Sequence, residues 1–521
     1  MTTEEIGLNP ALAAAGLQVL ETDLGEFIVQ LAGHPPAHLT APALHLNRRQ
    51  IAEIFAKHLG ARVPAEPEAL TRQAAAYLHP YFFEAQMGIT GVNFASPDGT
   101  LILVENESNL RFTATLPKVH LALMGVEKVI PRLTDLEVML RLLPASATGQ
   151  RLTALVHFIR GLKVQPRGRQ AFYLVILDNG RRRLAADPDM AEALYCLRCG
   201  ACLNACPIFQ VGAAHRYGRV YPGAIGILLA PYLAPTGDIC DLCTQCGACQ
   251  EICPVGIRLT EKILRLRHHS RRFRRLRLLS TAAGVVLNRP RWYRGLEPAW
   301  RGLAGLMARH GWGRLPALSP ESFYRQRQDR QRAGESGTDS PGRPPLPDVK
   351  VTEISSPVRG EAGRGAETAD PGLAATTLLA RRVAAAPPPV WLEDHPWLRG
   401  LAAELEKLGV QPRVAVSEWA PEAGTAVTVA LGAVPETGSV LVEAGGGPAA
   451  MLPFRAREHL ILVPRARAGM SLSQALAWVH RLGPLVSWLT GPSRTADIEK
   501  VLVLGAQGPR SLKIILYQEE T

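Results

Sequence analysis

The sequence has 521 residues, of which 47% are hydrophobic and 20% are charged, and it includes nine cysteines. At roughly 150 residues per domain this length predicts about three domains, and the hydrophobic fraction is typical of chains that fold around apolar cores. The net charge of +12 comes almost entirely from residues 258–301, where thirteen lysines and arginines stand against two glutamates. Because the rest of the chain is nearly neutral, the composition argues against a protein that coats nucleic acid.

The sequence contains no apolar run that approaches the roughly 20 residues needed to cross a bilayer. The best candidate, residues 278–287, is too short and includes Ser280, Thr281 and Gly284. The first residues, Met1-Thr-Thr-Glu-Glu, have neither the basic start nor the apolar stretch of a secretory signal. We therefore expect the chain to be cytoplasmic.

Residues 1–189 predict a mixed α/β domain. Residues 47–59 place apolar side chains at helical spacing, and Asn47 is a suitable N-cap for this helix. Residues 101–104 and 172–177 are short apolar runs next to turn residues, which predicts strands.

All nine cysteines lie in residues 190–257, between Cys196 and Cys253. A disulfide framework would distribute its cysteines over the elements that it joins, so this crowding indicates a metal centre. Two runs share one spacing: Cys196-x2-Cys199-x2-Cys202-x3-Cys206-Pro and Cys243-x2-Cys246-x2-Cys249-x3-Cys253-Pro.

This spacing is typical of bacterial ferredoxins, in which the fourth cysteine of each run ligates the other cluster. It predicts two [4Fe–4S] clusters with crossed ligands. One cluster would be held by Cys196, Cys199, Cys202 and Cys253, and the other by Cys243, Cys246, Cys249 and Cys206. Structural zinc is the alternative, but it needs only four ligands and leaves the second run unexplained.

The 36 residues between the two runs exceed the compact connection of a small ferredoxin, which suggests, by analogy, the helical ferredoxin arrangement of succinate dehydrogenase-type subunits. Gly200 and Gly247 are predicted where the backbone passes close to sulfur. Cys240 is left over, either as a spare buried thiol, as an alternative ligand, or as a cysteine near the cluster that tunes its potential. Four residues between the runs could donate to a cluster or simply pack against it: His215, Arg216, Tyr217 and Tyr221.

Residues 258–332 predict a basic helical extension. It could be a solvated helix, a docking face for an acidic partner or membrane surface, or a nucleic-acid contact. Of these, we do not expect nucleic acid to be a partner. Residues 333–389 are rich in Gly, Pro, Ser and Ala, which predicts a disordered linker. Residues 390–521 return to α/β character, with strands expected near residues 427–431, 440–443 and 512–517.

The two α/β segments carry similar motifs in the same order, which indicates a diverged duplication. The pairs are residues 97–105 with 435–443, Leu116-Pro with Leu452-Pro, His120 with His459, Thr148-Gly with Thr490-Gly, and Pro166-Arg with Pro509-Arg.

Residues 1–300 resemble the lactate-utilisation iron–sulfur protein family, in which a LUD domain precedes a twin ferredoxin segment. The residues that carry the resemblance are 21–26, 34–36, 41–45, 91–95, 115–120, 146–150 and the run Cys199-Gly-Ala-Cys-Leu-Asn-Ala-Cys-Pro. The tail, above all residues 491–499, looks like the companion LUD-only subunit, so the chain resembles a fusion of two subunits. The resemblance implies α/β LUD domains, similar to isomerases and CoA-transferases, that flank an α-helical ferredoxin domain.

The resemblance further implies an electron-transfer component of an L-lactate dehydrogenase complex, which oxidises lactate to pyruvate. Its partners would be the family's cysteine-rich two-repeat subunit and an electron acceptor, a quinone or respiratory carrier. Contact with the inner face of the membrane would bring the clusters towards a quinone. Members of the family usually have further residues before the point where Met1 falls, so we expect the first LUD domain to be short at its N-terminus.

Candidate acid/base and anion-binding residues in the first LUD segment are Glu105, Arg111 and His120, with Glu107 and Asn109 beside them. An arginine can bind a carboxylate and a histidine can take a hydroxyl proton near neutral pH, although surface or core roles explain each residue as well. Ser493 and Thr495 could form an anion-binding turn or an ordinary helix cap. The alternatives for function are another 2-hydroxy acid, such as glycolate, or a non-enzymatic redox or ligand-binding module.

Overall fold

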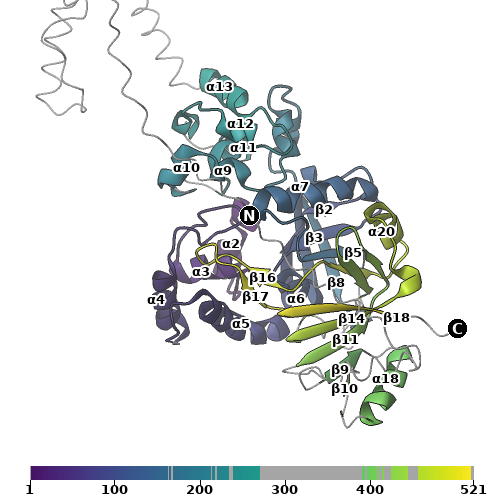
Figure 1. Cartoon of the computed structure of the whole chain (residues 1–521). Coiled ribbons are helices and arrows are strands. Elements are labelled where there is room, and N and C mark those ends of the chain that lie inside the picture. The colour runs from purple at the N-terminus through teal and green to yellow at the C-terminus, as the bar shows by residue number, and fades with distance from the viewer. Residues whose placement is uncertain are drawn as a thin grey trace, which may run out of the picture. The chain divides into compact units, whose positions relative to one another are not determined.

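In the computed structural model, the described residues are 2–269 and 390–517, apart from residues 61, 162–163, 166–167, 213, 218–219, 234–238, 394–395, 408–409, 411–412, 416–423, 444–453 and 455. The described residues belong to one compact unit (Figure 1). The predicted linker and the basic extension beyond residue 269 lie outside them, and the domain boundaries drawn from the sequence stay predictions. None of the helices in this part of the chain combines the length and apolar character that a membrane span requires.

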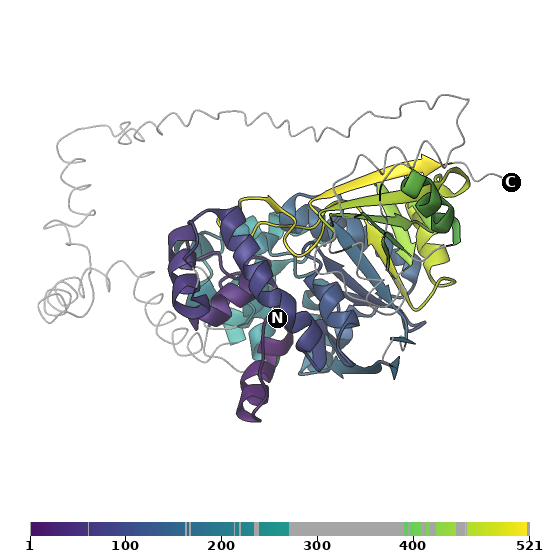
Figure 2. The same ribbon diagram turned by 90° about the horizontal axis from the view of Figure 1, so that it is seen from below.

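The N-terminal region is helical. Asn47 caps α4 by accepting hydrogen bonds from the backbone of Arg49 and Gln50, and Gln50 completes a capping box, which confirms the helix predicted over residues 47–59. Figure 2 shows α3 to α5 in purple as one group beside the yellow C-terminal loops. The helices are α1 Thr2–Glu5, α2 Leu8–Ala14, α3 Leu24–Ala32, α4 Arg48–Leu59 and α5 Pro67–Glu84.

The first α/β half builds two sets of strands. β1, β4 and β8 form a parallel three-stranded sheet, while β2, β3 and β5 pair antiparallel. The strands predicted at residues 101–104 and 172–177 are confirmed as β3 and β8. The elements are β1 Met87–Gly91, β2 Phe94–Ala95, β3 Leu101–Glu105, α6 Asn109–Thr115, β4 Val119–Gly125, α7 Leu136–Thr148, β5 Leu155–Ile159, β6 Val164–Gln165, β7 Gly168–Arg169 and β8 Ala171–Leu177.

The second α/β half repeats this order. β11, β14 and β18 are parallel as β1, β4 and β8 are, and β12, β13 and β15 are antiparallel as β2, β3 and β5 are. The elements are β9 Val390–Glu393, α18 Pro396–Lys407, β10 Arg413–Ala415, β11 Thr425–Val429, β12 Gly432–Val434, β13 Ser439–Glu443, β14 Glu458–Pro464, α20 Leu472–Val479, β15 Leu485–Leu489, β16 Arg494–Thr495, β17 Val503–Leu504 and β18 Ser511–Tyr517.

Equivalent side chains in the two halves make the same contacts. His120 on β4 bonds Thr90 on β1 over 2.8 Å, and His459 on β14 bonds Thr428 on β11 over the same distance. Residues 97–105 and 435–443 likewise fall on the matching strands β3 and β13, as a duplication would place them. The Thr-Gly pair does not match, because Thr148 ends α7 before β5 whereas Thr490 follows β15. The Leu452-Pro and Pro166-Arg pairs lie outside the described residues.

The two halves join in one antiparallel sheet with the order β12-β13-β15-β5-β3-β2. β5 and β15 meet at its centre, where Leu155 faces Leu489 and Ile159 faces Leu485. Phe158 packs against Trp488 with ring centroids 6.2 Å apart. The shared sheet and core show that the C-terminal segment packs as part of the first α/β body, a feature that the motifs did not predict.

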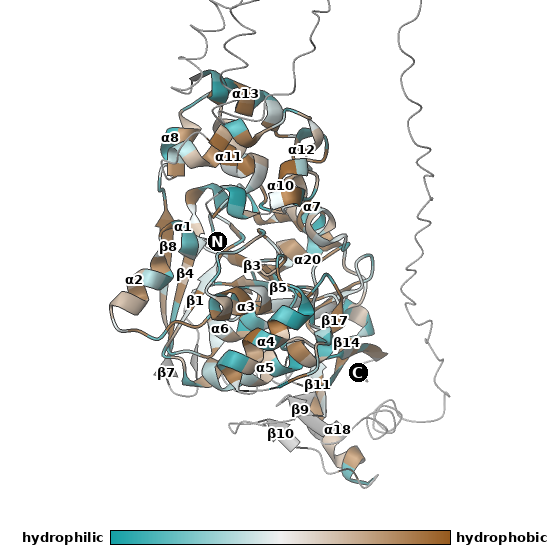
Figure 3. Cartoon of the chain, turned by 90° about the vertical axis from the view of Figure 1, so that its left-hand side faces the viewer, coloured by the Kyte–Doolittle hydropathy of each residue, from teal (hydrophilic) through white to brown (hydrophobic). Residues whose placement is uncertain are grey.

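The cysteine segment folds into short helices around α11. Eight of the eleven residues of α11 are buried, which fits a helix that is apolar on every side, and Figure 3 draws it largely in brown. The elements are α8 Arg181–Ala185, η3 Ala191–Tyr195, α9 Ala201–Asn204, α10 Pro207–Gly212, η4 Ala214–Tyr217, α11 Gly223–Leu233, η5 Ile239–Leu242, α12 Ala248–Glu251 and α13 Leu259–His269.

Candidate metal centre

The first cysteine run forms a loop that points a backbone N–H at sulfur. Arg198 has a φ of 64°, and its N–H donates to the Sγ of Cys196 over 3.4 Å. Gly200, two residues later, has a φ of 78° and begins the turn into α9. Left-handed backbone is costly for a side chain such as that of Arg198, so the hydrogen bond to sulfur compensates for local strain.

The second run repeats this geometry. Gln245 has a φ of 61° and donates from its N–H to the Sγ of Cys243 over 3.4 Å, and Gly247 has a φ of 86° before α12. A Cβ at Gly200 would meet the ring of His38, whereas one at Gly247 would meet no atom within 4 Å. Glycine is therefore favoured at both positions chiefly because the backbone there is left-handed. Gly247 in addition lines the cavity that the second run faces.

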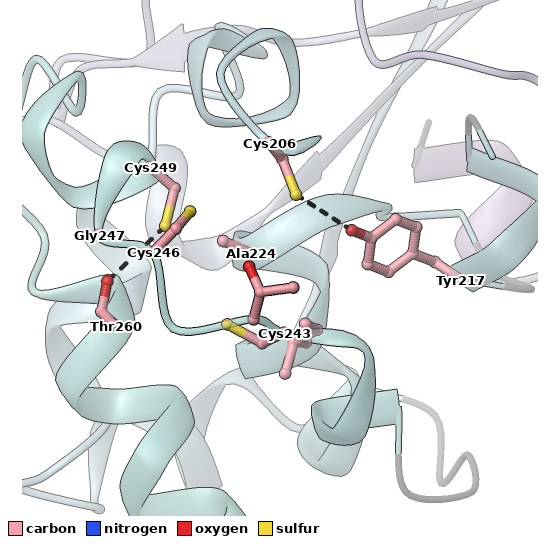
Figure 4. A pocket seen from close by; sticks show the side chains of 10 residues that line it. Cys206, Tyr217, Ala224, Cys243, Cys246, Gly247, Cys249 and Thr260 are labelled. Atoms are coloured by element: carbon pink, nitrogen blue, oxygen red, sulfur yellow. Dashed lines mark hydrogen bonds between the residues drawn. The ribbon is translucent and has the colours of Figure 1, made fainter. Parts of the chain in front are cut away.

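One cavity brings together cysteines from both runs. Cys206 of the first run lines it with Cys243, Cys246 and Cys249 of the second, as Figure 4 shows. The Tyr217 hydroxyl lies 3.4 Å from the Sγ of Cys206, and the Thr260 hydroxyl lies 3.9 Å from the Sγ of Cys249. Four thiols around one space, with N–H and O–H groups aimed at them, fit an iron–sulfur cluster better than they fit a packed core.

The other four cysteines lie close enough to act on one another. Burial raises the pKa of the Cys199 thiol, and the neighbouring Cys196 and Cys253 raise it further. Burial also raises the pKa of Cys202, on which both Cys196 and Cys249 act. A bound iron would offset this cost of ionisation, because its positive charge deprotonates its sulfur ligands. Cys249 belongs to the other set of four cysteines. Its effect on Cys202 therefore shows that the two sets are neighbours.

Cys240 does not line the cavity. Its side chain is 7% exposed and belongs to the apolar core around α11. Its carbonyl accepts a hydrogen bond from Arg267 on α13 over 2.7 Å, and Arg267 also binds the carbonyl of Cys243 over 2.6 Å. This placement favours the interpretation of Cys240 as a buried thiol that helps to anchor the loop.

The structure places two of the three predicted catalytic residues, Glu105 and Arg111, next to each other and His120 apart from them. Glu105 ends β3, accepts hydrogen bonds from the N–H groups of Leu110 and Arg111, and lies 2.6 Å from Nε2 of His157. It lines a second cavity, called here the LUD cavity, which lies between the ends of β1, β3 and β4 and residues 197–198 of the first cysteine run.

Arg111 is buried, with its guanidinium 4.1 Å over the ring of Phe454 and bonded to Ser487. Burial lowers its pKa to about 9. His120 lies inside the β1-β4-β8 layer against Phe172 and Thr90. Neither residue lines the LUD cavity, so their catalytic roles stay predictions, and packing accounts for both positions.

The remaining candidates also have neighbours that explain them. Glu107 accepts from the N–H of Leu24 at the start of α3, and Ser493 donates to the carbonyl of Glu107 over 2.9 Å. Among the residues between the runs, Tyr217 reaches a cysteine, while Tyr221 lies under the Arg198 guanidinium at 4.6 Å. Thr260 was not among the predicted residues, because its contact with Cys249 depends on how α13 folds back.

Known families match both parts of this architecture. The LUD domain family model matches residues 4–180 and 394–517, and the 4Fe-4S dicluster domain model matches residues 192–257. The chain therefore belongs to the LUD domain family and carries an iron–sulfur segment.

Among curated proteins, the chain is similar to lactate utilization protein B of Bacillus subtilis (strain 168), with 43% identity over 276 residues, which cover 52% of this chain and 57% of the relative. It is also 43% identical over 273 residues to the uncharacterized electron transport protein YkgF of Escherichia coli (strain K12), at 51% and 57% coverage. The matched part thus spans little more than half the length of these relatives.

Proposed function

We propose that the chain is an iron–sulfur electron-transfer component in the oxidation of L-lactate to pyruvate. The observation that carries this proposal is the cavity in which Cys206 of the first run joins Cys243, Cys246 and Cys249 of the second. This is the crossed set that a two-cluster ferredoxin uses, and the complementary set is Cys196, Cys199, Cys202 and Cys253. The names of the similar proteins support the link to lactate utilisation and electron transport.

Two [4Fe–4S] clusters bound to these cysteines would supply one-electron transfer. Oxidation of L-lactate to pyruvate releases two electrons and two protons, so two neighbouring one-electron centres can pass the pair on singly. The N–H groups of Arg198 and Gln245 stabilise negative charge on Cys196 and Cys243, and the Tyr217 hydroxyl does so at Cys206. Donors of this kind favour the reduced state of a cluster.

The partners belong to the same proposal. A cysteine-rich two-repeat subunit would work with this chain, and the electrons would pass to a quinone or respiratory carrier. The lysines and arginines between residues 258 and 301 suit an anionic membrane surface or an acidic partner. If the membrane is the partner, binding to anionic liposomes should weaken as salt is raised.

The direct test is reduction of the clusters by substrate. The purified chain, with clusters intact, is mixed anaerobically with L-lactate or glycolate, with and without the cysteine-rich subunit, and reduced clusters are followed by EPR. We expect L-lactate to reduce them in the complete complex. Reduction by glycolate alone would reassign the substrate, and no reduction in any mixture would leave a redox or ligand-binding module.

A further inference from the structure

The LUD cavity has the position and size of a ligand site. It has a volume of about 390 Å³ and opens at the carboxyl ends of the parallel strands β1 and β4, at Gly91 and Gly125. Ligands of open α/β sheets bind at this edge, and small-molecule sites usually occupy about 300 to 1,000 Å³. Its far wall is formed by Leu197 and Arg198, which lie between two cysteines of the first run.

Lys128 places a cation on the wall of this cavity that no described carboxylate pairs. Burial lowers its pKa to about 8, with a further lowering from Arg198, while Glu127 opposes the shift. No hydrogen bond or ion pair joins its ammonium to another residue in the described part of the chain. The Lys128 side chain is half-buried, and an unpaired cation on the wall of a cavity favours an anion at this place.

Arg198 presents a second unused donor. Its Nη2 lies 3.3 Å from Glu127, but its Nη1 is buried without a hydrogen-bond partner. The hydroxyl of Thr153, a residue 7% exposed on the same cavity wall, also has no partner. Unmade hydrogen bonds of buried donors are expensive, so both groups indicate a polar ligand.

The charges around the cavity leave one cation over. Glu127 is shared between Arg181 and Arg198, and Arg181 is further paired with Glu5 at 2.7 Å. The remaining carboxylate on the wall, Glu105, is held by two N–H groups and His157, with the buried Arg111 beside it. Lys128 is then uncompensated. Leucines at positions 110, 123 and 143 line the rest of the wall and suit a short alkyl group.

We propose that the LUD cavity binds the carboxylate of a small 2-hydroxy acid, or of its 2-oxo product, between Lys128 and the Nη1 of Arg198. The substrate class rests on the proposed function, whereas the anion site rests on the cavity itself. The N–H of Arg198 donates to the Sγ of Cys196, and the next residue along the chain is Cys199. A carboxylate held by the Arg198 side chain would therefore lie close to two of the proposed cluster ligands. Occupancy of the site therefore alters the electrostatic field at the cluster held by Cys196.

The test is ligand binding to the full chain with its clusters intact. Isothermal titration calorimetry with L-lactate, glycolate and pyruvate is run on the wild type, Lys128→Met and Arg198→Gln, with Lys118→Met as the matched control because Lys118 is exposed and outside the cavity. Loss of a charged hydrogen bond predicts at least a tenfold weaker affinity in the two cavity variants and no change in the control. Iron content is checked in each variant, since Arg198 lies between cluster ligands.

A second readout separates binding from a structural role. Saturating ligand should change the EPR spectrum of one cluster in the wild type and in Lys118→Met, but not in Lys128→Met at the same concentration. Equal affinities in all variants, or no binding of any of the three acids, would overturn the anion site. Binding that depends on Lys128, without reduction by lactate in the complete complex, would keep the site and reject the proposed function.

Discussion

Cys206 shows how a single side chain can belong to the neighbouring site. It ends the first run, and yet its sulfur faces the cavity of the second (Figure 4). We expect Cys206→Ser to lower the iron content from about eight to about four atoms per chain, because one cluster loses a thiolate. Iron determination and EPR measure this, with Cys240→Ser as the control that keeps its iron. Full iron in Cys206→Ser, or loss in Cys240→Ser, would contradict the crossed assignment.

Two glycines at the LUD cavity differ in what surrounds them. A Cβ at Gly125 would lie 2.0 Å from Oε2 of Glu127 and 2.5 Å from Nε of Arg181, whereas one at Gly91 would meet nothing within 4 Å. We expect Gly125→Ala to cost about 1 to 3 kcal/mol, since the buried ion pair must move, and Gly91→Ala to be close to neutral. Thermal unfolding midpoints compare the two, and equal midpoints would show that the ion pair shifts freely.

The cysteines are the part of the site that the sequence predicted best. Their spacing is local, so it reports ligand geometry directly, and the structure brings the four residues of the crossed set to one cavity. Tyr217 was one of four residues that the sequence offered equally as donors to a cluster. Lys128 and Thr260 were not predicted as site residues. Their contacts arise only when distant segments fold together, which spacing along the chain does not record.

Among the elements, the start of α3 collects carboxylates from three segments. Asp23, Glu107 and Asp497 place oxygens within 4.8 Å of one another, and Asp497 accepts from the N–H of Gly25 over 2.8 Å. Burial, and then the charge of Asp23, raises the pKa of Asp497 to about 8. Burial also raises the pKa values of Glu107 and Asp23.

A raised carboxyl pKa has a definite effect on stability. The carboxyl contributes fully to the free energy of unfolding below about pH 4, which is near its pKa in the unfolded chain. This contribution is lost as the pH rises towards 8, because the folded state resists ionisation of the group. Asp497→Asn should therefore stabilise the protein by about 1 to 2 kcal/mol at pH 8 and have little effect at about pH 4. Unfolding midpoints across this range measure it, with Glu84→Gln at an exposed site as the control. A variant less stable than the wild type at pH 8 would contradict the shift.

Helices and strands with local signals were predicted well. The helix over residues 47–59 begins at Asn47 because the cap and the apolar spacing agree, and β3 and β8 match apolar runs. The pairing of β5 with β15 was not predicted. Strand partners far apart in the chain are chosen by the packing of a whole sheet face, to which no short motif corresponds.

At the scale of the whole molecule, the two α/β halves depend on each other. β5 and β15 pair along their full length, and the core includes Phe158 and Trp488 from opposite halves. If a protease site is inserted between residues 333 and 389 and cleaved, the two fragments should stay together. Size-exclusion chromatography should show one species in native buffer and two in denaturant, and separation in native buffer would contradict the shared sheet.

The place of the cysteine segment between β8 and β9 sets an order of synthesis. His157 on β5 meets Ser487 on β15 across 330 positions of the chain, an interval of roughly 15 to 70 s at about 5 to 20 residues per second. The core around α11 draws almost entirely on residues 184–263, so it is complete well before β15 leaves the ribosome. Iron can thus enter while the central sheet is still open, and nascent chains arrested before residue 485 should already hold it; iron-free arrested chains would show that the closed sheet is needed first.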